Sequence, residues 1–174
     1  MGKLNGVKEK LQFPLYDAHL VEGSLAPETR TIQFFVNIQN KTRLETNLQM
    51  PSALPSFNTF EARAMRVVSN LRTPEALREL IFGSVTRLLV GEKTMIEVPT
   101  FYFPAGAGVA GSAAHGAPDP LATFRFAEPV QIEPQQNFRV ELQFPVGPGA
   151  DLQKEKGPYR IWVFLDGYLT RDVQ

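Results

Sequence analysis

The chain has 174 residues, of which 43% are hydrophobic and 21% charged, and its 18 Lys and Arg balance its 18 Asp and Glu. This length and composition are typical of one globular domain, and the zero net charge argues against a nucleic-acid binder that relies on a global basic field. Cysteine is absent, which excludes disulfides, thiolate metal sites and cysteine nucleophiles. The 13 Phe, 14 Pro and 13 Gly indicate strands and loops rather than long helices.

The beginning of the chain is polar, and residues 1–30 are predicted to form an N-terminal arm with a short strand at 12–16. A single domain is then expected over 31–174. No apolar core follows the three lysines of the first ten residues, so a secretory signal is not expected. The uncharged segment 98–118 is long enough to cross a bilayer, but its Pro and Gly content predicts a strand followed by a loop.

Alternation of apolar and polar residues predicts most of the remaining chain as strands. In 138–144, Arg139, Glu141 and Gln143 occupy the face opposite the apolar side chains. The predicted strand 57–69 loses its alternation near Met65, which indicates a bulge or burial on both faces. The other predicted strands cover 32–38, 84–90, 95–103, 123–127 and 159–170.

One short helix is predicted after Thr73, because Thr73-Pro74-Glu75 supplies an N-cap, a first-turn proline and an acid near the positive end of the helix dipole. Leu77, Leu80 and Ile81 follow at helical spacing, and Gly83 ends the helix. The elements together predict an all-β fold, a single jelly-roll barrel or sandwich of about eight antiparallel strands with one short helix.

Two short motifs carry structural alternatives. Asp166-Gly167 marks either a hairpin turn or a bulge in the last strand, and the bulge is favoured because Tyr168-Leu169 would be too short a return strand. The run Gly106-Ala-Gly108-Val-Ala-Gly111 matches the dinucleotide-binding fingerprint. That motif needs a helix at this point, and the Gly and Pro residues that follow forbid one, so a loop over 105–120 is predicted instead.

The sequence contains few residues that could support catalysis. His19 and His115 are the only histidines, which is too few for a cupin-type metal site, and no nucleophile elbow accompanies them. Glu61, Glu97 and Glu141 lie on predicted strands and could serve a glycosidase, but a solvated strand face is the favoured interpretation. No catalytic residue, cofactor site or metal site is therefore predicted.

Aromatic side chains and the long loop are better suited to contacts with other chains. The last strand carries Trp162 and Phe164 on the face opposite its aliphatic residues, as expected for a central strand or an interface. The loop over 105–120 is longer and richer in glycine than a strand connection needs. The predicted interface residues are Phe101, Phe103, Gly106, Gly108, Gly111, His115, Trp162 and Phe164.

The C-terminal third supports a family resemblance. The blocks 122–132, 138–144 and 159–171 resemble the closing strands of single jelly-roll viral capsid proteins, and the upstream blocks 57–68 and 88–103 fit the same pattern. Together with the length and the missing cysteines, they are similar to the small major capsid protein of tailless, membrane-containing icosahedral phages of Thermus, the sphaerolipovirus-like group.

The resemblance implies a single upright β-barrel that forms a homo-oligomer, most simply a homodimer, and co-assembles with a second, larger jelly-roll capsid protein. It further implies a virion location over an internal membrane, after synthesis in the host cytoplasm. This location leaves contact with viral membrane lipid open, and direct contact with nucleic acid is not expected. The family has no catalytic residues, so none are transferred to this chain.

Two rival functions fit the same predicted fold. A carbohydrate-binding module would use exposed aromatic rings as stacking platforms, although a single Trp weighs against it. An enzyme of the glycosidase type would use the glutamates named above. The candidate platforms are Tyr16, Tyr102, Tyr159, Trp162 and Tyr168.

Overall fold

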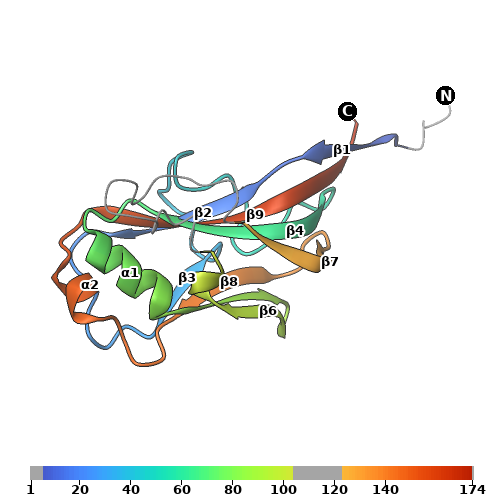
Figure 1. Cartoon of the computed structure of the whole chain (residues 1–174). Coiled ribbons are helices and arrows are strands. Elements are labelled where there is room, and N and C mark those ends of the chain that lie inside the picture. Colours follow the sequence, from blue (N-terminus) through green and yellow to red (C-terminus); the bar gives the residue numbers. More distant parts are fainter. Residues whose placement is uncertain (1–5, 104–122, 174) are drawn as a thin grey trace.

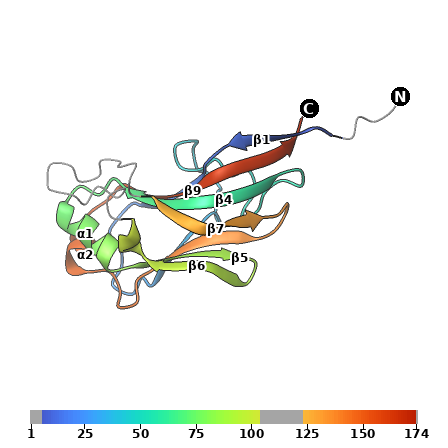
Figure 2. The same ribbon diagram turned by 45° about the vertical axis from the view of Figure 1, so that its right-hand side comes forward.

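The computed structural model describes residues 6–103 and 123–173, which form two antiparallel β-sheets packed face to face (Figures 1 and 2). The larger sheet has the order β1-β9-β4-β7, with β2 also paired to β9, and the smaller sheet has the order β3-β8-β5-β6. The strands of the larger sheet are β1 (Lys8–Gln12), β2 (Leu15–Val21), β4 (Thr59–Ser69), β7 (Phe124–Ile132) and β9 (Tyr159–Asp172). Those of the smaller sheet are β3 (Thr31–Phe34), β5 (Val85–Val90), β6 (Lys93–Pro99) and β8 (Phe138–Gln143).

The strand pairing is that of a rolled ribbon. Strand β5 pairs with β6 around a tight turn at Gly91, whose φ is +59°, and the strands on either side then pair in order, β4 with β7, β3 with β8 and β2 with β9. Successive pairs alternate between the two sheets, and the pairs β4/β9 and β5/β8 join them within each sheet. This wrapping of a two-stranded ribbon defines the jelly roll, so the predicted fold class is confirmed.

The hydrophobic core lies between the two sheets. On β9 the buried side chains are those of Ile161, Val163 and Leu165, each with 0% exposure, as the predicted alternation requires. Burial of large aromatic rings supplies much of the apolar area that stabilises a domain of this size. The aromatic residues of the core are Phe34, Phe35, Phe60, Phe103, Phe138, Phe144 and Tyr159.

The segment predicted as an arm over 1–30 contributes two strands to the larger sheet. Strand β2 pairs along 159–165 of β9, and strand β1 pairs along 168–172 of the same strand. Leu15 and Val21 are buried in the core, so the domain includes β2 rather than beginning at residue 31. Asp17 and His19 interrupt the apolar pattern of this strand, which is why the sequence did not reveal its burial.

The predicted helix is present as α1 (Pro74–Phe82), with the Thr73 hydroxyl accepting from the Ala76 amide at 3.4 Å and Gly83 following its last residue. A second helix, α2 (Ala150–Lys154), and a 3₁₀ turn, η1 (Thr100–Tyr102), were not predicted. Both α-helices lie at one end of the barrel, and β1 and the C-terminal end of β9 lie at the other (Figure 1).

Each α-helix receives a carboxylate from the other at its N-terminal end. Glu79 of α1 accepts the Leu152 amide of α2 at 2.7 Å. Glu155, which follows α2, accepts the Arg72 amide at 3.1 Å and the Thr73 hydroxyl at 3.0 Å. The Leu152 amide is one of the first amides of α2, which have no partner within the helix, so Glu79 satisfies it, whereas Glu155 binds the amide and hydroxyl of the two residues that precede α1.

Two predicted strands are shorter in the structure. Strand β3 ends at Phe34 rather than at residue 38, because Phe35 adopts a left-handed φ of +70°. Strand β6 ends at Pro99 rather than at residue 103, and η1 follows it. Each prediction extended an apolar run past the point where the backbone changes direction.

Asp166 and Gly167 lie within β9, which continues through them, so they do not form a hairpin turn. The register of β4 against β9 shifts between Ala62 and Ala64, and Arg63 is the extra residue. The extra residue therefore lies on β4 and not at Asp166-Gly167, where a bulge was favoured, and it is two residues before Met65, where the sequence indicated a bulge or burial on both faces. A Cβ at Gly167 would collide with the backbone carbonyl of Glu61, so glycine allows the strands to approach here.

Candidate interaction surfaces

Three aromatic side chains beside α1 are exposed and stacked, and we call them the aromatic patch: Phe82, Phe101 and Tyr102. Their exposed fractions are 56%, 42% and 51%. Ring centroids are 5.9 Å apart for Phe82 and Phe101 and 5.7 Å apart for Phe101 and Tyr102. The Tyr102 ring also meets Phe124 of β7 edge-on at 5.6 Å. Exposed apolar groups that gather in this way are typical of contact surfaces.

The predicted interface residues of this region have different positions. Phe101 belongs to the aromatic patch, whereas Phe103 has 0% exposure and packs edge-on against Phe124 at 5.9 Å, so Phe103 is a core residue. A continuous strand would place residues 101 and 103 on one face, but η1 interrupts that alternation, and the two side chains differ in burial. Gly106, Gly108, Gly111 and His115, with the loop predicted over 105–120, lie outside the described residues.

Trp162 and Phe164 lie on the outer face of β9, half-buried beneath other parts of the same chain. The Trp162 indole donates to the Leu44 carbonyl at 2.9 Å, and the Phe164 ring packs on Tyr16 at a centroid distance of 5.5 Å. The Arg66 guanidinium lies 4.7 Å from the centre of the Phe164 ring. The two apolar faces of this strand thus reflect its central position together with cover from the segment 42–48.

The three glutamates considered for a glycosidase do not share one site. Glu61 lies on β4 of the larger sheet, while Glu97 of β6 and Glu141 of β8 flank Arg87 on the smaller sheet. Burial would raise the pKa of Glu141, but its ion pairs with Arg87 and Arg139 outweigh burial and hold the pKa below its ordinary value. A general acid requires a raised pKa, so this environment does not suit that role.

The described residues include no group of three or more His, Asp or Glu side chains placed to hold a metal ion. His19 is half-buried on β2, and this burial lowers its pKa, with Lys41 lowering it further and Asp17 acting in the opposite direction. Within 6–103 and 123–173, no helix is long and apolar enough to span a membrane.

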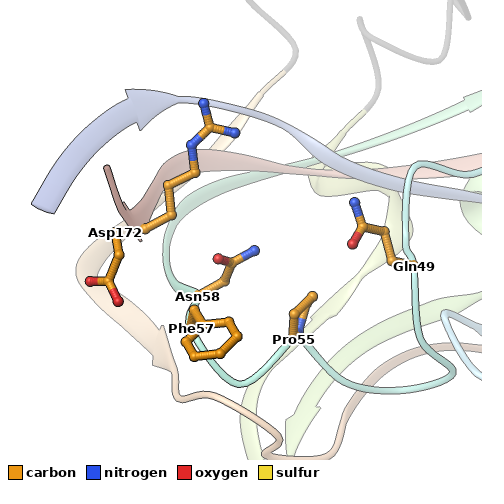
Figure 3. Close-up of a pocket in the computed structure, with 6 residues that line it drawn as sticks. Gln49, Pro55, Phe57, Asn58 and Asp172 are labelled. Atoms are coloured by element: carbon orange, nitrogen blue, oxygen red, sulfur yellow. The ribbon is translucent and has the colours of Figure 1, made fainter. Parts of the chain in front are cut away.

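A hollow of about 650 Å³ lies near the C-terminal end of β9, and we call it the Phe57 hollow (Figure 3). The Phe57 ring, 71% exposed, lies between Pro55 and Asp172, with Asn58 next to it and Gln49 on the far side of Pro55 (Figure 3). The lining residues are Gln49, Pro55, Phe57, Asn58, Arg171 and Asp172.

Sequence reasoning assigned Phe57 to a strand and missed this surface. Strand β4 begins only at Thr59, and Phe57 lies in a turn that the Asn58 amide closes by donating to the Pro55 carbonyl at 3.0 Å. A signal was present in the sequence, because Pro-Ser-Phe-Asn combines three turn-forming residues with one aromatic residue. An aromatic side chain in a turn has no sheet face against which to pack.

Most of the aromatic rings proposed as sugar-stacking platforms are buried or covered by other side chains. Tyr159 has 1% exposure, and burial, followed by the nearby Glu155 charge, raises the pKa of its hydroxyl to about 12. Lys10 and Arg63 cover Tyr168 at 4.7 and 5.1 Å from its ring centre. The Tyr16 hydroxyl donates to the Arg43 carbonyl at 2.6 Å, next to the covered Trp162. Tyr102 is the open one, in the aromatic patch.

The fold defines the chain as an all-β jelly-roll protein. Comparison with protein-family models and with curated proteins finds no match. Function therefore has to be argued from the surfaces described above, because one fold carries many functions.

Proposed function

We propose that the protein is a structural capsid subunit of a virion, which associates with itself as a homodimer and assembles with a larger jelly-roll protein into an icosahedral shell over an internal membrane. The jelly roll is a common architecture of viral capsid proteins, and lectins and cupins share it. A cupin function receives no support, since the described residues include no metal-ligand cluster. The resemblance of the C-terminal strands supports the larger partner and the membrane.

The aromatic patch is the observation that carries the proposal. Phe101 stacks on both Phe82 and Tyr102, and covering the part of each ring that is still exposed would be favourable by about 1 kcal/mol. Val146, which is 89% exposed, lines a hollow together with Phe82. Large aromatic side chains are enriched at the centres of protein interfaces, so this surface fits the contact between two subunits.

Charge on the outer face of the smaller sheet is consistent with close packing. Arg87 lies between Glu141 and Glu97, 3.9 Å from the latter, and Arg139 pairs with Glu141 at 2.8 Å. These charges are paired within the subunit, and the whole chain has zero net charge. Subunits that pack side by side at high local concentration then avoid the repulsion of a single-sign field.

Light scattering on the purified chain tests self-association. We expect a dimer that dissociates to a monomer when Phe82 and Phe101 are both replaced by serine. The matched control is Phe57→Ala, which removes an exposed ring near the C-terminal end of β9, away from the aromatic patch, and should leave the dimer intact. A wild-type chain that stays monomeric at every concentration would contradict the proposal.

Electron microscopy tests the shell itself. Immunogold labelling with an antibody to the chain should mark the surface of membrane-containing icosahedral particles from producing cells. Label found only on material without particles would contradict a capsid role, even if the chain is dimeric.

A further inference from the structure

The Phe57 hollow has side chains whose hydrogen-bonding groups are unused within the described part of the chain. The amides of Gln49 and Asn58 and the carboxylate of Asp172 make no side-chain hydrogen bond or ion pair there, and the Phe57 ring meets no other ring. The Arg171 guanidinium, by contrast, is paired with Glu9 of β1. The hollow thus offers free donors and acceptors beside an open aromatic face.

The backbone on two sides of the hollow is held in place by the larger sheet. Asn58 immediately precedes β4, whose first residue pairs with Thr170 of β9, and the turn from Pro55 to Asn58 is closed by a 3.0 Å hydrogen bond. Asp172 is the last residue of β9 and pairs with Lys8 of β1. The backbone positions of Asn58 and Asp172 are therefore set before a ligand binds, and only their side chains have to be ordered.

The chemistry of these groups selects a class of ligand. A side-chain amide presents a donor and an acceptor side by side, which matches adjacent hydroxyls, and a carboxylate accepts from hydroxyls. An exposed Phe ring provides a flat apolar surface for the C–H face of a sugar ring. The free carboxylate of Asp172, with Arg171 already paired, disfavours phosphates and other anions.

We propose that the Phe57 hollow is a binding site for a neutral saccharide. The sugar ring stacks on Phe57, its hydroxyls exchange hydrogen bonds with Gln49 and Asn58, and Asp172 accepts a further one. A volume of about 650 Å³ is within the range of small-molecule sites and accommodates more than one sugar unit. This proposal does not rest on the capsid function, because the hollow lies where β9 ends, and Figure 1 shows this end of β9 at the opposite end of the barrel from α1, the helix that carries Phe82.

Nuclear magnetic resonance titration of the ¹⁵N-labelled full chain tests the site. The probes are maltotriose, chitotriose, mannotriose and galactose, with glucose 6-phosphate as an anionic comparison. We expect at least one neutral probe to give saturable shifts of the backbone amides of Phe57, Asn58 and Asp172 and of the side-chain amides of Gln49 and Asn58.

Variants then connect the shifts to the hollow. Phe57→Ala and Asn58→Ala should each weaken binding at least about tenfold, which corresponds to the loss of one good contact. Phe82→Ala removes a comparably exposed ring of the aromatic patch and should leave saccharide affinity unchanged. Because Phe57 is 71% exposed, its removal leaves the core intact, and the spectrum of the variant reports its folding directly.

Three results would overturn the proposal. The first is that none of the neutral probes saturates at about 100 mM, far above a dissociation constant of about 1 mM. The second is that the shifts map to the aromatic patch or survive in Phe57→Ala. The third is that glucose 6-phosphate binds more tightly than every neutral probe. Saccharide binding by a chain that remains monomeric would support this site and contradict the capsid proposal, so the two can fail separately.

Discussion

The carboxylate of Asp17 accepts a hydrogen bond from the backbone amide of Phe35 at 2.7 Å. This bond joins β2 of one sheet to the residue that follows β3 of the other. Asp17 is fully buried, and Phe35 has a left-handed φ of +70°. Lys41 Nζ lies 2.9 and 3.0 Å from the two oxygens of the same carboxylate. One buried acid thus fixes both the reversal of the chain after β3 and the start of the segment that covers Trp162.

Replacing Asp17 with Asn should destabilise the fold. The variant keeps the shape of the side chain but removes the charge that compensates Lys41, whose side chain is 19% exposed. Breaking a largely buried ion pair costs about 3 kcal/mol, and the free energy of unfolding measured in urea should fall by that amount. Glu9→Gln at the exposed pair with Arg171 is the control and should cost under about 1 kcal/mol. Equal losses would mean that burial of Asp17 contributes nothing.

Gly167→Ala should also destabilise the protein, by about 3 kcal/mol, because the new methyl group would collide with the backbone carbonyl of Glu61 on β4. A backbone atom in a central strand pair cannot move aside as a flexible side chain can. Gly23→Ala is the matched control, since a Cβ there meets nothing within 4 Å, and it should be neutral or slightly stabilising. Thermal unfolding of both variants compares them, and a neutral Gly167→Ala would disprove the close approach.

Glu79→Gln and Glu155→Gln test the exchange of carboxylates between the two helices. Each variant should lower the free energy of unfolding by about 1 kcal/mol, since a charged acceptor of backbone amides at a helix start becomes a neutral one. Glu75→Gln, in the first turn of α1 where no hydrogen bond to α2 is recorded, should cost less. Denaturant curves measure all three, and the exchange is unimportant if Glu75→Gln costs as much as the others.

The sequence predicts an element well when the residues that determine its ends are close to it in the chain, and poorly when they are distant. Helix α1 could be predicted because Thr73 and Pro74 start the helix and Gly83 ends it through contacts with residues less than two turns away. The end of β3 could not, since Phe35 adopts its left-handed conformation beside the carboxylate of Asp17, eighteen residues away. Helix α2 is likewise capped by Glu79 from far along the chain, and its five residues are too few to show a period.

The same division applies to the surfaces. Trp162 and Phe164 were predicted correctly to lie opposite the buried face of β9, because alternation is a local property. Their cover by the segment around Leu44 is a tertiary contact that alternation cannot reveal. The Phe57 hollow joins residues more than a hundred positions apart, Asn58 and Asp172, which meet only because β4 pairs with β9.

Because of His19, we expect the folded state to lose stability as the pH falls from about 7 to 5. Burial lowers its folded-state pKa below 6.5, so the unfolded chain takes up a proton first as the pH falls, and unfolding is favoured. The free energy of unfolding should decline by up to about 1.4 kcal/mol per pH unit in this range. In His19→Gln this part of the pH profile should be flat. A wild-type profile that is already flat from pH 7 to 5 would contradict the inferred burial.

Protonation of Glu45 should cause a second structural transition at more acidic pH, which the fluorescence of the single tryptophan can report. Its carboxylate accepts the Thr42 amide at 2.8 Å and the Arg160 guanidinium at 3.0 Å, and so holds the segment that covers Trp162. The Thr42 hydrogen bond is the main cause that lowers the pKa of Glu45, with burial opposing it and Arg160 assisting. The stabilisation is therefore complete above about pH 4.5 and is lost as the pH falls through the lower, folded-state value.

We expect the emission of Trp162 to shift to longer wavelength below pH 4.5, before the circular dichroism of the sheets changes, because the covering segment opens locally first. In Glu45→Gln the shift should already be present at pH 7, since a neutral amide binds Arg160 weakly. Glu97→Gln, at the long and exposed contact with Arg87, should leave the emission unchanged. Coincident fluorescence and dichroism transitions in the wild type would instead mean that the segment opens only when the whole domain unfolds.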